Sequence, residues 1–210
     1  MKWIDYLIIL LLTLSAWQLW KWFKNQSKED PLVRIQFFPL LVYHLIVTLY
    51  YHGYSLSHGG DAIRYWEITA DLSQYAKTWM QYFGFSTFFM QWLNFIPSKV
   101  LGLSFLSGNL IYGFGSFTGI VLGVLITRSF FSKSETNTWI SILPFLIWWF
   151  PGLHFWTAGV GKENLLFLGL LLTVWSLSFA KERFLFLILG IAIMILVRPF
   201  CGVLILLPSV

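Results

Sequence analysis

The chain is poor in charge and in cysteine. Of its 210 residues only 11% are Asp, Glu, Lys or Arg, which is less than half the roughly 25% of soluble domains. The single cysteine, Cys201, excludes an internal disulfide and a cysteine-based zinc site. The positive charges are scattered without a basic run, so the net charge of +5 predicts no nucleic-acid partner.

Apolar residues are in large excess. They make up 58% of the chain, and Phe, Trp and Tyr alone account for 20%. A soluble domain of this length cannot bury so much apolar surface. The composition therefore excludes a disordered chain, a coiled coil and an ordinary soluble enzyme. It predicts one all-α polytopic membrane domain over residues 1–210.

Long apolar runs mark the expected membrane spans. About 20 apolar residues in a helix cross the hydrocarbon core. The pattern predicts about six transmembrane helices, at about 3–23, 35–51, 101–127, 139–155, 164–180 and 184–207. The first run is too long and too rich in tryptophan for a cleaved signal peptide.

Basic residues concentrate in three of the predicted connections. These residues are Lys21, Lys24, Lys28 and Arg34, then Arg128 and Lys133, then Lys181 and Arg183. The positive-inside rule makes that side cytoplasmic, which puts the N-terminus and the segment 54–100 outside. The lack of a retention or lipidation signal favours a bacterial inner membrane.

The outer segment is expected to contain interfacial amphipathic helices. Apolar residues recur at three-to-four spacing from Asp61 to Met80, which predicts a helix lying in the interface. The apolar stretch from Tyr82 to Ile96 is short for a span. It predicts either a second interfacial helix or a re-entrant segment.

Three glycines share one face of the third predicted span. Gly115, Gly119 and Gly123 are four residues apart, a spacing that lets another helix approach closely. Tight packing within the chain is the simpler interpretation, and a homo- or hetero-oligomer is the alternative.

Four groups of polar residues fall on the predicted outer side. The first is Gly59-Gly60-Asp61 with Arg64 and Trp66, where Asp61 is either a helix N-cap or a general base, or both. The second is the turn from Pro151 to Asn164. Lys162 begins a helix there, where the helix dipole is unfavourable to it. Its partner is either a phosphate or, as a snorkelling pair, the neighbouring Glu163.

The third group is Arg198-Pro199-Phe200, late in the sixth predicted span. A charged residue inside an apolar run is a functional candidate, with snorkelling to the surface as the alternative. The fourth is His44, which is more readily explained as a packing residue than as a ligand. No two histidines have a metal-ligand spacing, and no nucleotide-binding or serine-nucleophile motif occurs.

Together, three of these motifs resemble the GT-C-type membrane glycosyltransferases, and most closely the bacterial surface-polysaccharide polymerases and polyprenyl-phosphate-sugar transferases. The resemblance rests on Gly-Gly-Asp61, on the turn with His154, Trp156, Lys162 and Glu163, and on Arg198-Pro199-Phe200. It implies that an acidic residue in the first large outer loop, here Asp61, acts at the active site. Family members are usually longer, so it also implies a truncated product, a fragment or one part of a larger assembly.

The residues suggest roles in transfer of a sugar from a polyprenyl-phosphate-linked donor to a glycan or lipid acceptor. Asp61 would serve as general base, and Glu163 would orient Lys162 or act as a second carboxylate. The other expected substrate-binding residues are Arg64, Lys162 and Arg198 for the phosphate, Trp66 and Trp156 for stacking on the sugar, and His154 for the phosphate or the sugar. No cofactor is identified, and a divalent cation is left open.

Two other function classes stay open at this stage. A non-catalytic membrane subunit for assembly or export of surface glycans would explain the short chain and the glycine face. A small transporter is a third candidate, but transport usually needs ionisable groups along a midplane path, and only His44 is central.

Overall fold

The computed structural model describes residues 2–28, 30–68, 78–131, 143–178 and 183–206, with the backbone alone for 204–206. Within these ranges the chain is helical and has no β-strand, which confirms the all-α prediction for this part. The elements are α1 (Trp3–Gln26), α2 (Pro31–Ile35), α3 (Phe37–His58), α4 (Asp61–Glu67), η2 (Trp79–Tyr82), α5 (Thr87–Asn94), η3 (Phe95–Val100), α6 (Phe105–Phe131), η4 (Leu143–Trp149), α8 (Pro151–Thr157), α9 (Lys162–Ser178), α10 (Phe184–Val197) and α11 (Pro199–Leu206).

Three stretches of helix among the described residues are long and apolar enough to cross a membrane. They are α1, the nearly continuous α2–α3 (Pro31–His58) and α6. The bent pair α8–α9 adds a fourth if it is counted as one span, and α10 is apolar but shorter, with 14 residues. The length and composition of these helices thus agree with a helical membrane protein. The six spans that the sequence predicts exceed the three or four found among the described residues.

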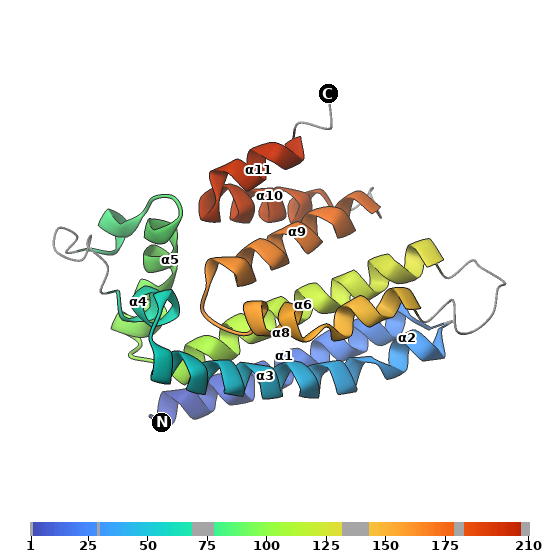
Figure 1. Cartoon of the computed structure of the whole chain (residues 1–210), viewed down its shortest axis with the longest axis horizontal. Coiled ribbons are helices and arrows are strands. Elements are labelled where there is room, and N and C mark those ends of the chain that lie inside the picture. The colour runs from blue at the N-terminus through green and yellow to red at the C-terminus, as the bar shows by residue number, and fades with distance from the viewer. Residues whose placement is uncertain (1, 29, 69–77, 132–142, 179–182, 207–210) are drawn as a thin grey trace.

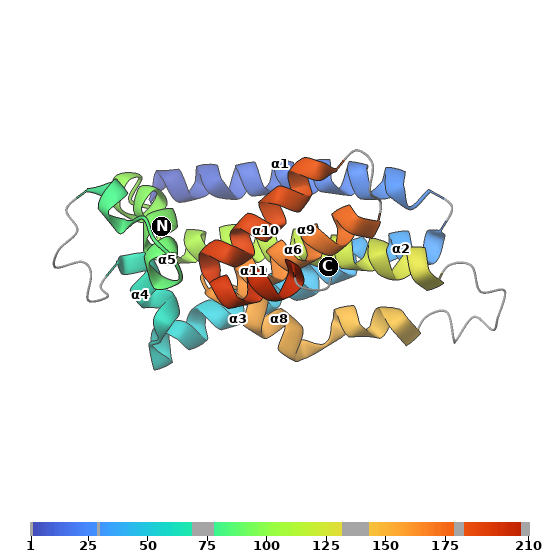
Figure 2. The ribbon, with the colours of Figure 1, turned by 90° about the horizontal axis from the view of Figure 1, so that it is seen from above.

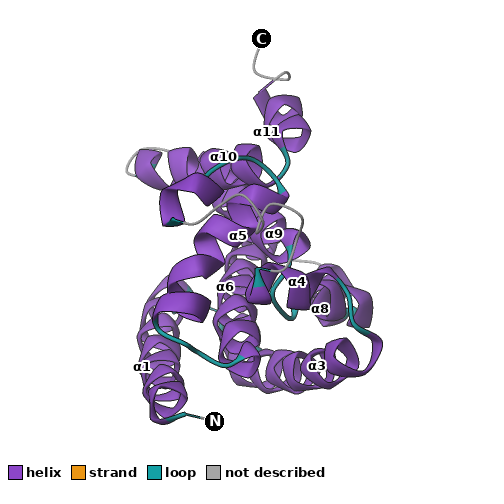
Figure 3. Cartoon of the chain, turned by 90° about the vertical axis from the view of Figure 1, so that its left-hand side faces the viewer, coloured by secondary structure: helices purple, strands orange, loops and turns teal. Residues whose placement is uncertain are grey.

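The long helices form two layers (Figures 1 and 3). α6 lies in the middle of one layer and contacts both α1 and α3, while α9 packs on α6 from the other layer and is covered by α10. Figure 2 shows α1 along one side of the bundle and α8 along the other. In the most apolar window of each helix, 67% of α6 is buried but only 6% of α1. α6 is therefore the core helix, and α1 faces outward over most of its surface.

The fourth predicted span is not one regular helix. Residues 143–149 form 3₁₀ turns, Phe150 is extended, and Pro151 begins α8, while residues 139–142 lie outside the described ranges. α8 then meets α9 at an angle of 110°. Proline has no N–H to continue a helix and disfavours helical backbone at the residue before it, so an apolar run does not guarantee a straight span.

The sixth predicted span is broken for the same reason. Arg198 has an extended backbone (φ −144°, ψ 95°) between α10 and α11, and Pro199 starts the new helix. The break places the arginine at a helix end, where its side chain reaches the surface.

The segment that the sequence predicts to lie outside has shorter helices than expected. α4 ends at Glu67 because Ile68 adopts a left-handed backbone (φ 55°), and residues 69–77 of the predicted helix are outside the described ranges. Of the stretch from Tyr82 to Ile96, only Thr87–Asn94 is α-helical, and a π-helical turn follows. Phe83 and Phe85 are more than half exposed, as suits a segment lying in the interface.

The glycine face of α6 is used within the chain. A Cβ atom on Gly119 would lie 3.0 Å from the ring of Phe167, and one on Gly123 would lie 2.1 Å from the ring of Trp148. α9 and η4 therefore cover this face. An oligomer formed through Gly115, Gly119 and Gly123 would have to displace these side chains.

Candidate functional site

Charged side chains from three distant parts of the chain meet at one end of the bundle. α4 begins there with Asp61, α9 begins with Lys162 and Glu163, and α10 ends just before Arg198 (Figure 1, left). Lys162 lies within electrostatic range of the other three residues. Asp61, Lys162, Glu163 and Arg198 are called the charged cluster below.

Arg198 and Glu163 form an ion pair at the surface of this cluster. One guanidinium nitrogen of Arg198 lies 2.7 Å from Oε1 of Glu163, and the two side chains are 51% and 47% exposed. Such exposed pairs stabilise a fold by only about 0–1 kcal/mol. A guanidinium has five N–H groups in all, so this pairing leaves donors for an incoming anion.

Lys162 is held by neighbouring side chains at the start of α9. Its ammonium donates to Oγ1 of Thr87 at 3.0 Å and lies 5.3 Å from the ring centre of Tyr65. A cation at a helix N-terminus opposes the helix dipole. Thr87 and the tyrosine ring therefore offset an unfavourable position and keep the charge at the cluster.

Asp61 is exposed and is not the N-cap of α4. Gly60 occupies that position, in a turn where Gly59 and Gly60 both have positive φ (71° and 128°). The carboxylate instead accepts a hydrogen bond from the Tyr65 hydroxyl at 3.3 Å. Burial, followed by the charge of Asp61, raises the pKa of Tyr65 to about 12. The hydroxyl thus stays protonated near neutral pH and remains a donor to Asp61.

The other predicted site residues are dispersed. Arg64 is exposed on α4 and Trp156 is 67% exposed on α8. Trp66 is only 4% exposed, and its ring packs against Gly108 of α6. His154 is fully buried. This placement does not support sugar stacking by Trp66 or contact of His154 with a ligand at the surface.

Two members of the site were not predicted from the sequence. Tyr65 follows Asp61 by one helical turn, and this spacing was a usable signal that the two side chains meet. Thr87 carries no such signal, because only the packing of α5 beside α4 brings it to Lys162.

A second polar group lies inside the bundle. The Nδ1 atoms of His44 and His154 are 2.9 Å apart, Nε2 of His44 is 2.9 Å from Oγ of Ser116, and Nε2 of His154 is 2.7 Å from the carbonyl oxygen of Trp148. These residues come from α3, α8, α6 and η4. Asn164 of α9 extends the group by donating to the carbonyl oxygens of Tyr112 and Thr157. Together they form the buried network.

The buried network satisfies a backbone group freed by the helix break. Pro151 follows Trp148 by three residues and has no N–H to offer its carbonyl. His154 donates to this carbonyl instead. The imidazole of His154 therefore stabilises the chain at the break between η4 and α8. The local sequence does not reveal this role.

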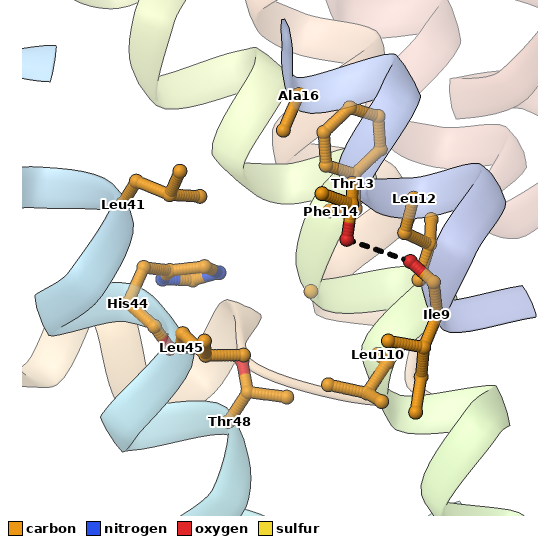
Figure 4. A pocket seen from close by; sticks show the side chains of 11 residues that line it. Ile9, Leu12, Thr13, Ala16, Leu41, His44, Leu45, Thr48, Leu110 and Phe114 are labelled. Atoms are coloured by element: carbon orange, nitrogen blue, oxygen red, sulfur yellow. Dashed lines mark hydrogen bonds between the residues drawn. The ribbon is translucent and has the colours of Figure 1, made fainter. Parts of the chain in front are cut away.

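An apolar cavity of about 230 Å³ borders the buried network (Figure 4). It lies between α1, α3 and α6 and is lined by Ile9, Leu12, Thr13, Ala16, Leu41, His44, Leu45, Thr48, Leu110, Gly113 and Phe114. The hydroxyls of Thr13 and Thr48 bond to carbonyls of their own helices, so the cavity offers few free polar groups.

No preformed metal centre occurs in the part of the chain that the structure describes. There, no three His, Cys, Asp or Glu side chains stand close enough together to hold an ion. The divalent cation left open by the sequence thus gains no set of protein ligands among these residues.

Comparisons with known proteins give no relative to reason from. The chain matches no family model, no curated protein and no solved structure. Its function must be argued from the charged cluster and from the membrane setting.

Proposed function

We propose that this protein is a multi-pass membrane glycosyltransferase that transfers a sugar from a polyprenyl-phosphate-linked donor to a glycan or lipid acceptor. One observation carries the proposal, namely the convergence of Asp61, Lys162, Glu163 and Arg198 at one end of an apolar bundle. A lipid-linked sugar has its phosphate at the membrane interface and its sugar in water. The charged cluster would meet such a substrate at that boundary.

The proposed chemistry is a displacement at the sugar's anomeric carbon. An acceptor hydroxyl oxygen forms the new bond to this carbon, and Asp61 takes the hydroxyl proton. The bond to the phosphate oxygen breaks, and the polyprenyl phosphate leaves with the electron pair. Lys162 and Arg198 stabilise the charge that develops on that oxygen, while Glu163 orients Arg198 through their ion pair.

The proposal includes an orientation with the charged cluster outside, in a bacterial inner membrane. The positive-inside rule supports it, since Lys24, Arg128 and Arg183 lie near the opposite end. There, Arg128 donates to the backbone carbonyl of Gln26 and forms an ion pair with Asp30, and Arg183 stacks on Trp175, which contacts Trp22. We take α8, α9 and the broken α10–α11 as further membrane segments, which brings the count toward six.

Binding of the phosphate is the first test. Native mass spectrometry of the purified protein would compare polyprenyl phosphate with the uncharged polyprenol. We expect Lys162→Gln and Arg198→Gln each to weaken binding of the phosphate at least about tenfold, because each removes a charged hydrogen-bond donor. Lys24→Gln, at the opposite end, is the matched control. Equal binding of phosphate and polyprenol, or equal loss in the control, would contradict the proposal.

Transfer is the second test. In proteoliposomes with a radiolabelled polyprenyl-phosphate sugar and a glycan acceptor, Asp61→Asn should abolish product while leaving donor binding within about twofold. An asparagine cannot take the acceptor proton but keeps the shape of the side chain. Full transfer by Asp61→Asn would remove Asp61 as the base.

A further inference from the structure

The buried network offers more contacts than its own protons can fill. Four of its contacts each take one hydrogen: His154 Nε2 to the Trp148 carbonyl, Nδ1 to Nδ1, His44 Nε2 to Ser116 Oγ, and Ser116 Oγ to the Thr157 carbonyl at 2.7 Å. The hydroxyl of Ser116 also lies 3.0 Å from the Gly113 carbonyl, and the Thr157 carbonyl also accepts from Asn164. Two neutral imidazoles and one hydroxyl supply three hydrogens. Ser116 therefore donates either to His44 or to a carbonyl, and one of the four contacts stays open in the neutral state.

When Ser116 donates to a carbonyl, the open contact is the one between the two Nδ1 atoms. The Trp148 carbonyl can only accept, so Nε2 of His154 carries a hydrogen, and the Nδ1 of a neutral His154 is then an acceptor. At the other end, a hydroxyl that donates to the Thr157 carbonyl needs a hydrogen from Nε2 of His44. Both Nδ1 atoms would then face each other at 2.9 Å with lone pairs only.

We propose that His44 and His154 form a proton-binding site inside the membrane domain, in which one added proton is shared between their two Nδ1 atoms. Uptake turns the neutral pair into an imidazole–imidazolium pair with one positive charge and fills all four contacts. In the neutral state Ser116 turns its hydrogen to Nε2 of His44, and His44 donates from Nδ1 to His154. The hydroxyl of Ser116 is thus the moving part of the site.

The surroundings make this proton exchangeable. Within the described residues, His154 is the only ionisable side chain that acts on His44 electrostatically. The ring of Tyr43, on α3, lies 4.4 Å from the ring of His154. The other neighbours of the pair are Ser116 and Phe117 of α6, Thr157 of α8, Trp148 of η4 and Asn164 of α9. α1 contributes Thr13 across the cavity.

Carbonyl oxygens and aromatic faces stabilise the shared charge moderately, and no carboxylate among the described residues acts on His44. Burial of the site opposes the charged form. We therefore expect uptake on acidification and full release near neutral or mildly alkaline pH. This inference is independent of the proposed sugar transfer, since it uses none of the residues in the charged cluster.

Nitrogen NMR of the imidazoles tests the site directly. The chain has four histidines, so His52→Gln together with His58→Gln leaves only the pair to observe. The ¹⁵N-histidine-labelled protein in lipid nanodiscs would be titrated from about pH 8 to about pH 3, because burial of the site opposes the charged form. We expect the two rings to titrate together, with uptake of one proton in total and a hydrogen-bond coupling between the two Nδ1 atoms. Two rings that stay neutral throughout, or that each take a full proton, would overturn the proposal.

Ser116→Ala sharpens the test. It removes the acceptor for Nε2 of His44 in the charged state, so the midpoint of uptake should fall by about one pH unit. Ser129→Ala, on the same helix with its hydroxyl bonded to the Ile126 carbonyl, is the matched control and should leave the midpoint unchanged. An unchanged or raised midpoint in Ser116→Ala would contradict the assignment. The titration of the protein without Ser116→Ala or Ser129→Ala changes no residue of the buried network. It therefore tests the proposal even if Ser116→Ala folds poorly.

Discussion

The charged cluster and the buried network are two polar regions with opposite designs. In the cluster, charges face water, and its ion pair joins side chains that are about half exposed. In the network, neutral groups with almost no exposure join α3, α6, α8 and α9. The cluster can change partners at little cost to the fold, whereas each donor of the network satisfies a backbone or side-chain group that has no water to replace it.

This difference separates tests of function from tests of folding. Changes in the cluster should alter ligand binding and leave stability nearly intact. Changes in the network should lower stability first. Three variants measure this difference by their loss in the free energy of unfolding. If the ranking of these losses were reversed, the two regions would have been assigned the wrong roles.

The largest loss is expected from Asn164→Leu. The amide of Asn164 donates to the carbonyl oxygens of Tyr112 and Thr157, and leucine leaves both without this donor. We expect a loss of about 2–3 kcal/mol in the free energy of unfolding, measured by denaturant titration in mixed micelles. Asn25→Leu, on the exposed last turn of α1, is the control. Equal stability of the two variants would show that the network does not hold α9.

A smaller effect, with a distinct pH dependence, is expected from Tyr65→Phe. The variant loses the hydrogen bond to Asp61, which is worth about 0.5–1.5 kcal/mol. Because the folded-state pKa of Tyr65 is raised to about 12, the hydroxyl stabilises the fold below about pH 10, and this contribution is lost between about pH 10 and about pH 12. The stability of the protein relative to Tyr65→Phe should therefore fall across that window.

The comparison variant for this pH effect is Tyr50→Phe, which alters a 65% exposed ring. Its stability, measured over the same pH range, is the reference for the change in Tyr65→Phe. A constant gap for Tyr65→Phe over the same range would refute the raised pKa of Tyr65.

The smallest effect on folding is expected from Arg198→Gln. Its ion pair with Glu163 is about half exposed, so the free energy of unfolding should fall by less than about 1 kcal/mol, while the proposed phosphate binding should weaken at least about tenfold. At the opposite end, Arg128 is less exposed and contacts both Gln26 and Asp30. Arg128→Gln should therefore cost more stability than Arg198→Gln, and thermal unfolding in one detergent would rank the two.

Hydropathy alone was enough to predict the long helices that have no break. The first three predicted spans correspond to α1, α2–α3 and α6, because a continuous apolar run in a bilayer must form a helix. It failed at Pro151 and Pro199, where the apolar run continues but the backbone cannot. The start of α6 was also placed too early, since Gly102 turns the chain (φ 62°) before Phe105 begins the helix.

The candidate site was predictable in part. Asp61, Lys162, Glu163 and Arg198 stood out as charges beside apolar runs, and the expected crossing pattern placed them on one side. The pairing of His44 with His154 spans 110 residues, and no local pattern encodes it. The same holds for Thr87, whose contact with Lys162 depends on how α5 packs beside α4.

Asp5 joins α1 to residues at and just before the start of α6, far along the chain, and this contact bears on how the protein is made. Asp5 is fully buried near the start of α1 and accepts hydrogen bonds from the backbone of Ser104 and the hydroxyl of Ser107. Those partners lie 99 and 102 residues further along, so at roughly 5–20 residues per second they leave the ribosome about 5–20 s later. α1 enters the bilayer first but gains this anchor only when α6 arrives. The helix that is synthesised first is thus anchored only after about half of the chain has been made.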